Sequence, residues 1–130
     1  MTIPFWCLLI AAFLPIVLAG IGGYFKSQQF DTLDNNNPRV QSAQLVGAGA
    51  RAVAAQQNAW EALAIFTAAV AIAHMAGVDP ATSATPAMLF IASRVLHGGF
   101  YIADLAPLRS VSFLVALGSC IWLFSQAAMV

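Results

Sequence analysis

The chain alternates long apolar stretches with short polar ones, a pattern typical of helices that cross a membrane. Four apolar stretches reach the roughly 20 residues that a membrane-spanning helix needs. The segments between them are rich in Asn, Asp, Gly and Pro, which favour turns. The pattern predicts a single all-α domain, residues 1–130, folded as an integral membrane four-helix bundle with spans at about 3–25, 49–77, 86–106 and 109–129.

Proline and glycine residues indicate where these spans begin and end. The polar stretch 26–48 is predicted to be a loop outside the membrane. The sequence Gly77-Val78-Asp79-Pro80 is expected to end the second span, and the third is expected to start near Pro86. Pro107 is expected to break the third helix before the fourth begins.

Composition agrees with a membrane protein and excludes some partners. Hydrophobic residues make up 61% of the chain and charged residues 8%, with a mean hydropathy of +0.83. The net charge is zero and no basic patch is present, so nucleic acid is not an expected partner. Cys7 and Cys120 stand alone in apolar segments without the spacing of metal ligands, so no metal is expected.

Polar side chains interrupt the second apolar stretch on one side. Arg51, Asn58 and Glu61 are separated by seven and three residues, which places them within roughly an 80° arc of one helix face. An ionisable side chain at mid-bilayer costs about 2.5–3.5 kcal/mol on insertion scales. Such a group therefore faces a bundle interior and either forms a site or satisfies a purely structural network; both interpretations are open at this point.

The third apolar stretch carries a second polar face. Arg94, His97, Tyr101 and Asp104 lie at offsets of zero, three, seven and ten residues, again within roughly 80°. Asp104 is expected to form a helix-end ion pair with Arg94 or Arg109. Because the second span begins where the third ends, the two polar faces are predicted to meet in one pocket.

Positive charges predict the orientation in the membrane. Lys26, Arg39 and Arg51 lie in or beside the first connection, Arg94 and Arg109 flank the third, and the second connection has no Lys or Arg. The excess of Lys and Arg in cytoplasmic loops then places the segments 26–48 and 104–109 in the cytoplasm and both termini outside. The predicted pocket opens to the cytoplasm.

The polar residues of this pocket suit a small zwitterion that carries a thiol. Guanidinium groups bind carboxylates in bidentate pairs, and the carboxylate of Glu61 suits an ammonium group. A guanidinium such as that of Arg109 close to a thiol favours the nucleophilic thiolate, and Tyr101 is placed to donate a hydrogen bond to the same sulfur.

These residues resemble the motifs of the MAPEG family, the membrane-associated proteins in eicosanoid and glutathione metabolism. The resemblance covers essentially the whole chain and includes the segment Asn37-Pro38-Arg39, which is similar to the first loop of bacterial members. The matching residues are Arg51, Asn58, Glu61 and Phe66 in the second span, Arg94, His97 and Tyr101 in the third, and Arg109 with Ser110 before the fourth.

The resemblance implies a homotrimer in the bacterial inner membrane, with glutathione as co-substrate held between subunits near the cytoplasmic side. It implies that glutathione contacts Asn58, Glu61, Arg94, His97, Tyr101 and Arg109. Arg109 and Tyr101 are the implied catalytic residues. The implied activity is glutathione transfer to a lipophilic electrophile or reduction of a lipid hydroperoxide, with the second substrate entering from the lipid bilayer.

Two positions depart from the family pattern. Ala54 stands where family enzymes usually have an arginine, and Ala64 stands where a proline is frequent. Arg51, one turn before Ala54, is the candidate replacement for the missing glutathione contact. The alternative is a non-catalytic protein of the same fold that serves as a binding or assembly subunit of a larger membrane complex.

Haem binding or proton transport is a third class of function, based on His74 and His97. Along their helices the two residues differ in depth by roughly 15 Å, at 1.5 Å per residue. One haem iron is therefore not expected to bind both histidines within a subunit, and His74 is expected to be a helix-end residue.

Overall fold

The computed structural model describes all 130 residues and is entirely helical, which confirms the predicted all-α class. Four helices are long and one is short, and no strand is present. The helices are α1 (Ile3–Gln29), α2 (Pro38–Ala43), α3 (Gly47–Met75), α4 (Pro80–Ile102) and α5 (Ala106–Ala128).

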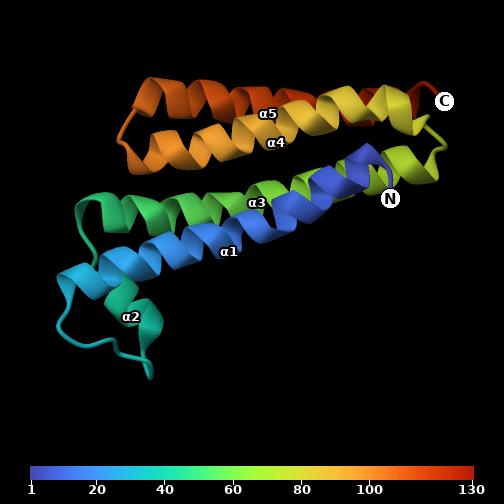
Figure 1. The fold of residues 1–130 in the computed structure, drawn as a ribbon. Coiled ribbons are helices and arrows are strands. Elements are labelled where there is room, and N and C mark those ends of the chain that lie inside the picture. The colour runs from blue at the N-terminus through green and yellow to red at the C-terminus, as the bar shows by residue number, and fades with distance from the viewer.

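The four long helices run up and down in two layers, with α1 beside α3 and α4 beside α5 (Figure 1). Both termini and the α3–α4 turn lie at one end of the molecule, and the α4–α5 turn lies at the other (Figure 1). The short helix α2 projects beside the ends of α1 and α3 (Figure 1). The ends of α3 and α4 that carry the predicted polar faces are thus at the same end of the fold.

Three helices, α1, α3 and α5, are long and apolar enough to cross a membrane. Helix α4 has 23 residues but is not among them. Its polar side chains, including Thr82, Ser83, Arg94 and His97, lower its hydropathy. The fourth predicted span therefore remains a prediction.

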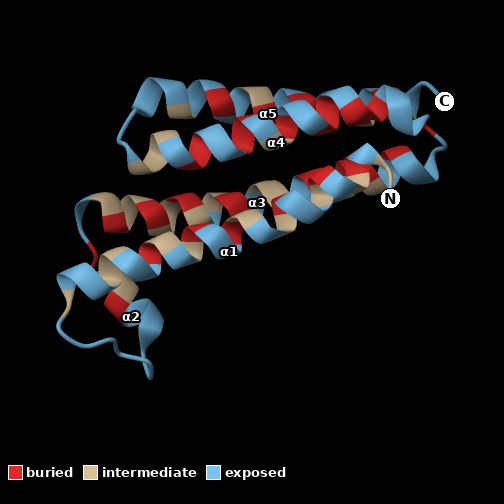
Figure 2. Ribbon diagram, viewed as in Figure 1, coloured by how far each residue is buried: buried red, intermediate tan, exposed pale blue.

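Small side chains fill the contacts between the helices, as is common where helices pack in a membrane. Ala52, Ala55, Ala69 and Ala87 are fully or almost fully buried. Between α3 and α4 the rings of Phe66 and Phe90 stack with centroids 3.8 Å apart. Buried residues face the interior of the bundle, whereas the outward faces are exposed (Figure 2). Those faces carry large apolar side chains, as expected for surfaces in contact with lipid.

The first connection is more ordered than the predicted loop. Helix α1 continues to Gln29, and Pro38 starts α2 because a proline lacks the N–H that a first helical turn leaves unpaired. Lys26 Nζ donates to Pro38 O at 3.0 Å, and Gln41 Nε2 donates to Thr32 O at 2.8 Å. The first bond holds α2 against the end of α1, and the second holds it against the loop that follows α1.

The prolines at positions 80 and 107 begin helices, so two expected boundaries were wrong. Helix α4 starts at Pro80, six residues before Pro86, because Asp79 Oδ1 accepts the backbone N–H of Ala81 at 3.1 Å and caps the helix. Pro107 lies in the first turn of α5. The break occurs earlier, at residues 103–105, where Asp104 has φ 62°.

Gly98 of α4 is the point where α1 and α4 approach closely. A Cβ added at Gly98 would lie 3.3 Å from Leu18 Cδ2, whereas a Cβ at Gly99 would meet nothing within 4 Å. We expect Gly98→Leu to destabilise the protein by about 1–3 kcal/mol, the usual cost of overpacking. Gly99→Leu is the matched control and is expected to leave the melting temperature in detergent unchanged or raised, because leucine favours helix over glycine. Equal melting temperatures for the two variants would contradict this close contact.

Candidate functional site

A buried guanidinium with free donors lies at the centre of the candidate site. Arg94 of α4 is 2% exposed, and its NH2 group donates to Asn58 Oδ1 of α3 at 2.7 Å. Its Nε and NH1 atoms have no hydrogen-bond partner, and Arg94 forms no ion pair. A buried charge is normally paired and hydrogen-bonded. No carboxylate lies within ion-pair distance of this cation, although Glu61 lines the same cleft.

His97 and Tyr101 follow Arg94 along α4 on the same face. His97 is 3% exposed, and its Nδ1 atom has no hydrogen-bond partner. Tyr101 packs edge-on to His97, with ring centroids 5.6 Å apart. Arg109, in the first turns of α5, places its Cζ atom 4.6 Å from the centroid of the Tyr101 ring. This cation–π contact brings the guanidinium of α5 to the polar face of α4.

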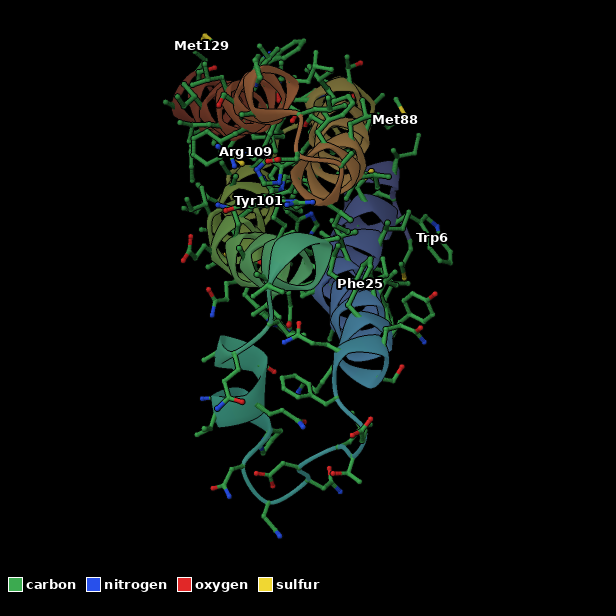
Figure 3. All side chains as sticks on the ribbon, turned by 90° about the vertical axis from the view of Figure 1, so that its left-hand side faces the viewer. Trp6, Phe25, Met88, Tyr101, Arg109 and Met129 are labelled. Carbon is green, nitrogen blue, oxygen red and sulfur yellow. The ribbon has the colours of Figure 1, made fainter.

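The labelled side chains in Figure 3 show which flank of the molecule carries this cluster. Tyr101 and Arg109 lie near each other between the α4–α5 layer and α3 (Figure 3). Trp6 and Met88 lie on the opposite flank (Figure 3). The cluster is therefore confined to the side formed by α3, α4 and α5.

Two adjoining depressions open on this flank. The first, which we call the polar groove, has a volume of about 370 Å³ and is lined by Asn58, His97, Tyr101, Arg109, Ser110, Phe113 and Leu114. The second, which we call the apolar cleft, has a volume of about 150 Å³. Its lining consists of Asn58, Glu61, Ala62, Ile65, Phe90, Arg94, Phe113, Ala116, Leu117 and Cys120. Asn58 and Phe113 line both, so the two depressions are neighbours.

The structure brings together most of the residues that the sequence predicted as site residues. Asn58, Glu61 and Arg94 line the apolar cleft, and His97, Tyr101 and Arg109 line the polar groove. The combined site holds two guanidinium groups against the single carboxylate of Glu61, so it favours a ligand with net negative charge.

Arg51 is not grouped with these residues. Its Nε atom donates to Ile102 O at 3.0 Å, and its NH1 atom lies 3.9 Å from Asp104 Oδ2. It lines neither the polar groove nor the apolar cleft. Asp104 does form the predicted helix-end ion pair, but its partner is Arg51, so the expected pairing with Arg94 or Arg109 was wrong.

Several lining residues were not identified as site residues from the sequence, among them Phe90, Phe113 and Cys120. Phe113 and Cys120 come from α5, and Phe90 comes from α4. Their spacing along the helices could have identified them, because residues four or seven apart share a helix face. Phe113 lies four residues after Arg109, Cys120 lies seven after Phe113, and Phe90 lies four before Arg94. Each therefore shares the helix face of a residue that the motif already marked.

His74 is outside the site, as expected for a helix-end residue. It lies in the last turn of α3, is exposed, and packs edge-on to Phe5 with ring centroids 5.0 Å apart. His97 lies instead against Tyr101, five residues before the end of α4. The two histidines belong to separate surroundings, which removes the basis for a shared haem ligand.

Comparison with known proteins identifies the family of this fold. No curated protein matches the chain. The model of the MAPEG family, however, matches residues 3–129, which is nearly the whole sequence. The match includes all the residues of the polar groove and the apolar cleft. The chain therefore belongs to the MAPEG family and is an integral membrane protein.

Proposed function

We propose that the protein is a glutathione-dependent membrane enzyme. It transfers glutathione to a lipophilic electrophile or reduces a lipid hydroperoxide. The observation that carries the proposal is the buried Arg94, which has two unpartnered nitrogen atoms and lines a cleft together with a carboxylate and an amide. Membership of the MAPEG family supports glutathione as the ligand.

Glutathione carries charged groups that can pair with these side chains. One of its carboxylates accepts hydrogen bonds from the unpartnered nitrogen atoms of Arg94. Its ammonium group pairs with the carboxylate of Glu61. Asn58 is already oriented by Arg94 and keeps its amide N–H donors for the peptide. His97 Nδ1 remains available for a further hydrogen bond.

The thiol of glutathione is placed beside Arg109 and Tyr101 in the polar groove. A guanidinium near the sulfur stabilises the thiolate and so lowers the pKa of the glutathione thiol. The Tyr101 hydroxyl donates to the same sulfur. Arg109 lies in the first turns of α5, where the helix N-terminus adds positive potential. The thiolate then attacks the electrophile, displacing its leaving group or adding to an activated double bond. With a hydroperoxide it attacks an oxygen and breaks the O–O bond, which gives an alcohol and a sulfenic acid of glutathione; a second glutathione reduces that sulfenic acid to the disulfide and water.

The walls of the apolar cleft, beside the glutathione contacts, accept the second substrate. These walls are mainly Ala62, Ile65, Phe90, Phe113 and Ala116, and the cleft adjoins the polar groove. A lipophilic molecule dissolved in the bilayer is concentrated next to such an opening. The second substrate then reaches the thiolate from the bilayer without passing through water.

We also propose how the subunits assemble and how the protein is oriented in the membrane. The subunit has four spans, with α4 as the fourth, and three subunits form a homotrimer. The segments 26–48 and 104–109 face the cytoplasm of a bacterium and both termini lie outside, in agreement with the distribution of Lys and Arg. The polar groove, beside the α4–α5 turn, then opens toward the compartment that contains glutathione.

A thiolate absorbance measurement tests the proposed function. Purified protein in detergent is titrated with glutathione, and the ultraviolet absorbance of the thiolate is followed at neutral pH. We expect a saturable increase, with no increase for S-methylglutathione, which has no thiol. Binding of neither peptide, measured by calorimetry in the same sample, would overturn the proposal.

One observation favours a second candidate function, that of a non-catalytic subunit in a larger membrane complex. Ala54 provides no guanidinium, and Arg51, the candidate replacement, is bonded to Ile102 and Asp104. The ligand would then lose one charged contact. Recovery of a stoichiometric protein partner in mild detergent, together with absence of the thiolate signal, would support this candidate.

A further inference from the structure

The corner between α4 and α5 has a backbone that usually requires glycine. Asp104 has φ 62°, in the left-handed region. The N–H of Leu105 donates to Phe100 O at 2.9 Å, and the N–H of Asp104 donates to Tyr101 O at 3.2 Å. This is the pattern of a helix C-terminus closed by a left-handed residue, a position that glycine occupies most often. Aspartate also tolerates this conformation, and its side chain adds a carboxylate to the corner.

Arg51 of α3 contacts the corner twice. Its Nε atom donates to Ile102 O, a carbonyl at the end of α4, at 3.0 Å. Its NH1 atom lies 3.9 Å from the Asp104 carboxylate, the one ion pair in the chain. The side chain therefore fixes the corner to a helix that is 51 residues away in sequence.

The corner connects directly to the two residues placed at the thiol. Tyr101 precedes Ile102, the acceptor of the Arg51 bond, and its own carbonyl accepts the N–H of Asp104. The N–H of Arg109 donates to Leu105 O at 2.9 Å, so the first turn of α5 starts from the corner. A shift of the corner would change the 4.6 Å separation between Arg109 Cζ and the Tyr101 ring.

We propose that Arg51 is a positioning residue that holds the α4–α5 corner, and through it the Arg109–Tyr101 pair, rather than a residue that binds glutathione. This inference rests on the proposed function for its effect on catalysis. The contacts that carry it, between Arg51, Ile102 and Asp104, are independent of any ligand.

Kinetics of Arg51→Gln test the effect on catalysis. We expect kcat to fall about 10- to 100-fold, the scale of a small misplacement of catalytic groups, while KM for glutathione changes less than twofold. The thiolate titration of bound glutathione should move to higher pH. Arg51→Lys keeps the charge near Asp104 and should recover part of kcat. A raised KM with unchanged kcat would identify Arg51 as a glutathione ligand and overturn the inference.

Amide hydrogen exchange tests the corner without any substrate. In ligand-free Arg51→Gln we expect exchange at Asp104 and Leu105 to be about tenfold faster than in the unaltered protein, because the corner opens more easily. Asp104→Asn, which tolerates the left-handed backbone but removes the ion pair, should show a smaller increase. Unchanged exchange in Arg51→Gln would overturn the inference. Faster exchange in Arg51→Gln, in a protein that gives no thiolate signal with glutathione, would support the structural role of Arg51 and reject the proposed function.

Discussion

Replacing Arg94 with methionine is expected to weaken glutathione binding by about 10- to 150-fold. The expected loss corresponds to the roughly 1.5–3 kcal/mol that a hydrogen bond to a charged group contributes. Arg94 is buried and has two nitrogen atoms without partners, so in the proposed complex it forms new bonds to a carboxylate. No other guanidinium lines the apolar cleft.

The same substitution is expected to leave the ligand-free protein at least as stable as before. A buried cation that forms no ion pair has lost its hydration, and an apolar side chain of similar length avoids that cost. Asn58 would lose its bond from Arg94, but it is only half-buried and can turn toward solvent. Opposite effects on ligand affinity and on melting temperature distinguish a binding residue from a structural one.

Calorimetric titration with glutathione and thermal melting in the same detergent measure both quantities. Leu96→Met is the matched control, because Leu96 lies on the same helix and is exposed. The control should bind glutathione as the unaltered protein does. A large fall in melting temperature for Arg94→Met, with unchanged affinity, would show that the Arg94–Asn58 bond serves the fold alone.

Replacing Arg109 with leucine is expected to lower kcat at neutral pH by about 100-fold or more, the scale seen when one group that stabilises a developing or bound anion is removed. The guanidinium lies 4.6 Å from the Tyr101 ring and lines the polar groove. Without it, the pKa of the bound glutathione thiol rises toward its ordinary value. The thiolate is then scarce at neutral pH, and the rate should recover as the pH is raised.

The pH dependence of kcat and the thiolate absorbance at saturating glutathione check this prediction. Arg109→Lys retains a positive charge and should show a smaller shift, because lysine lacks the planar group that stacks on Tyr101. A uniform loss of activity at every pH would instead indicate that Arg109 acts on glutathione affinity or on the fold.

Helical periodicity predicted the core of the site but not every member. The offsets between Asn58 and Glu61, and between Arg94, His97 and Tyr101, gave one face for each helix, and these faces do meet. Arg51 has the same angular position as Asn58, yet it lies two turns nearer the helix end. At that height the nearest acceptors are the last carbonyl of α4 and Asp104. Periodicity gives the direction of a side chain and not the neighbour that it meets.

The helix boundaries show a similar limit. A proline in an apolar run predicts either a helix break or a first helical turn. A break was predicted at Pro80 and at Pro107, but both lie in the first turn of a helix. Asp79 before Pro80 is a capping residue and was the signal for a start. The left-handed backbone of Asp104 had no such signal, since aspartate is uncommon there and its ion pair with Arg51 depends on the tertiary fold.

The placement of both termini at the end opposite the α4–α5 turn has a practical consequence for reporter and affinity-tag design (Figure 1). Helix α5 continues for 19 residues from Arg109 to Ala128, a rise of roughly 30 Å toward the C-terminus at 1.5 Å per residue. A fluorescent protein or a purification peptide fused at Met1 or Val130 therefore leaves the polar groove unobstructed. Such fusions allow immobilised protein to be assayed with the groove facing free solution.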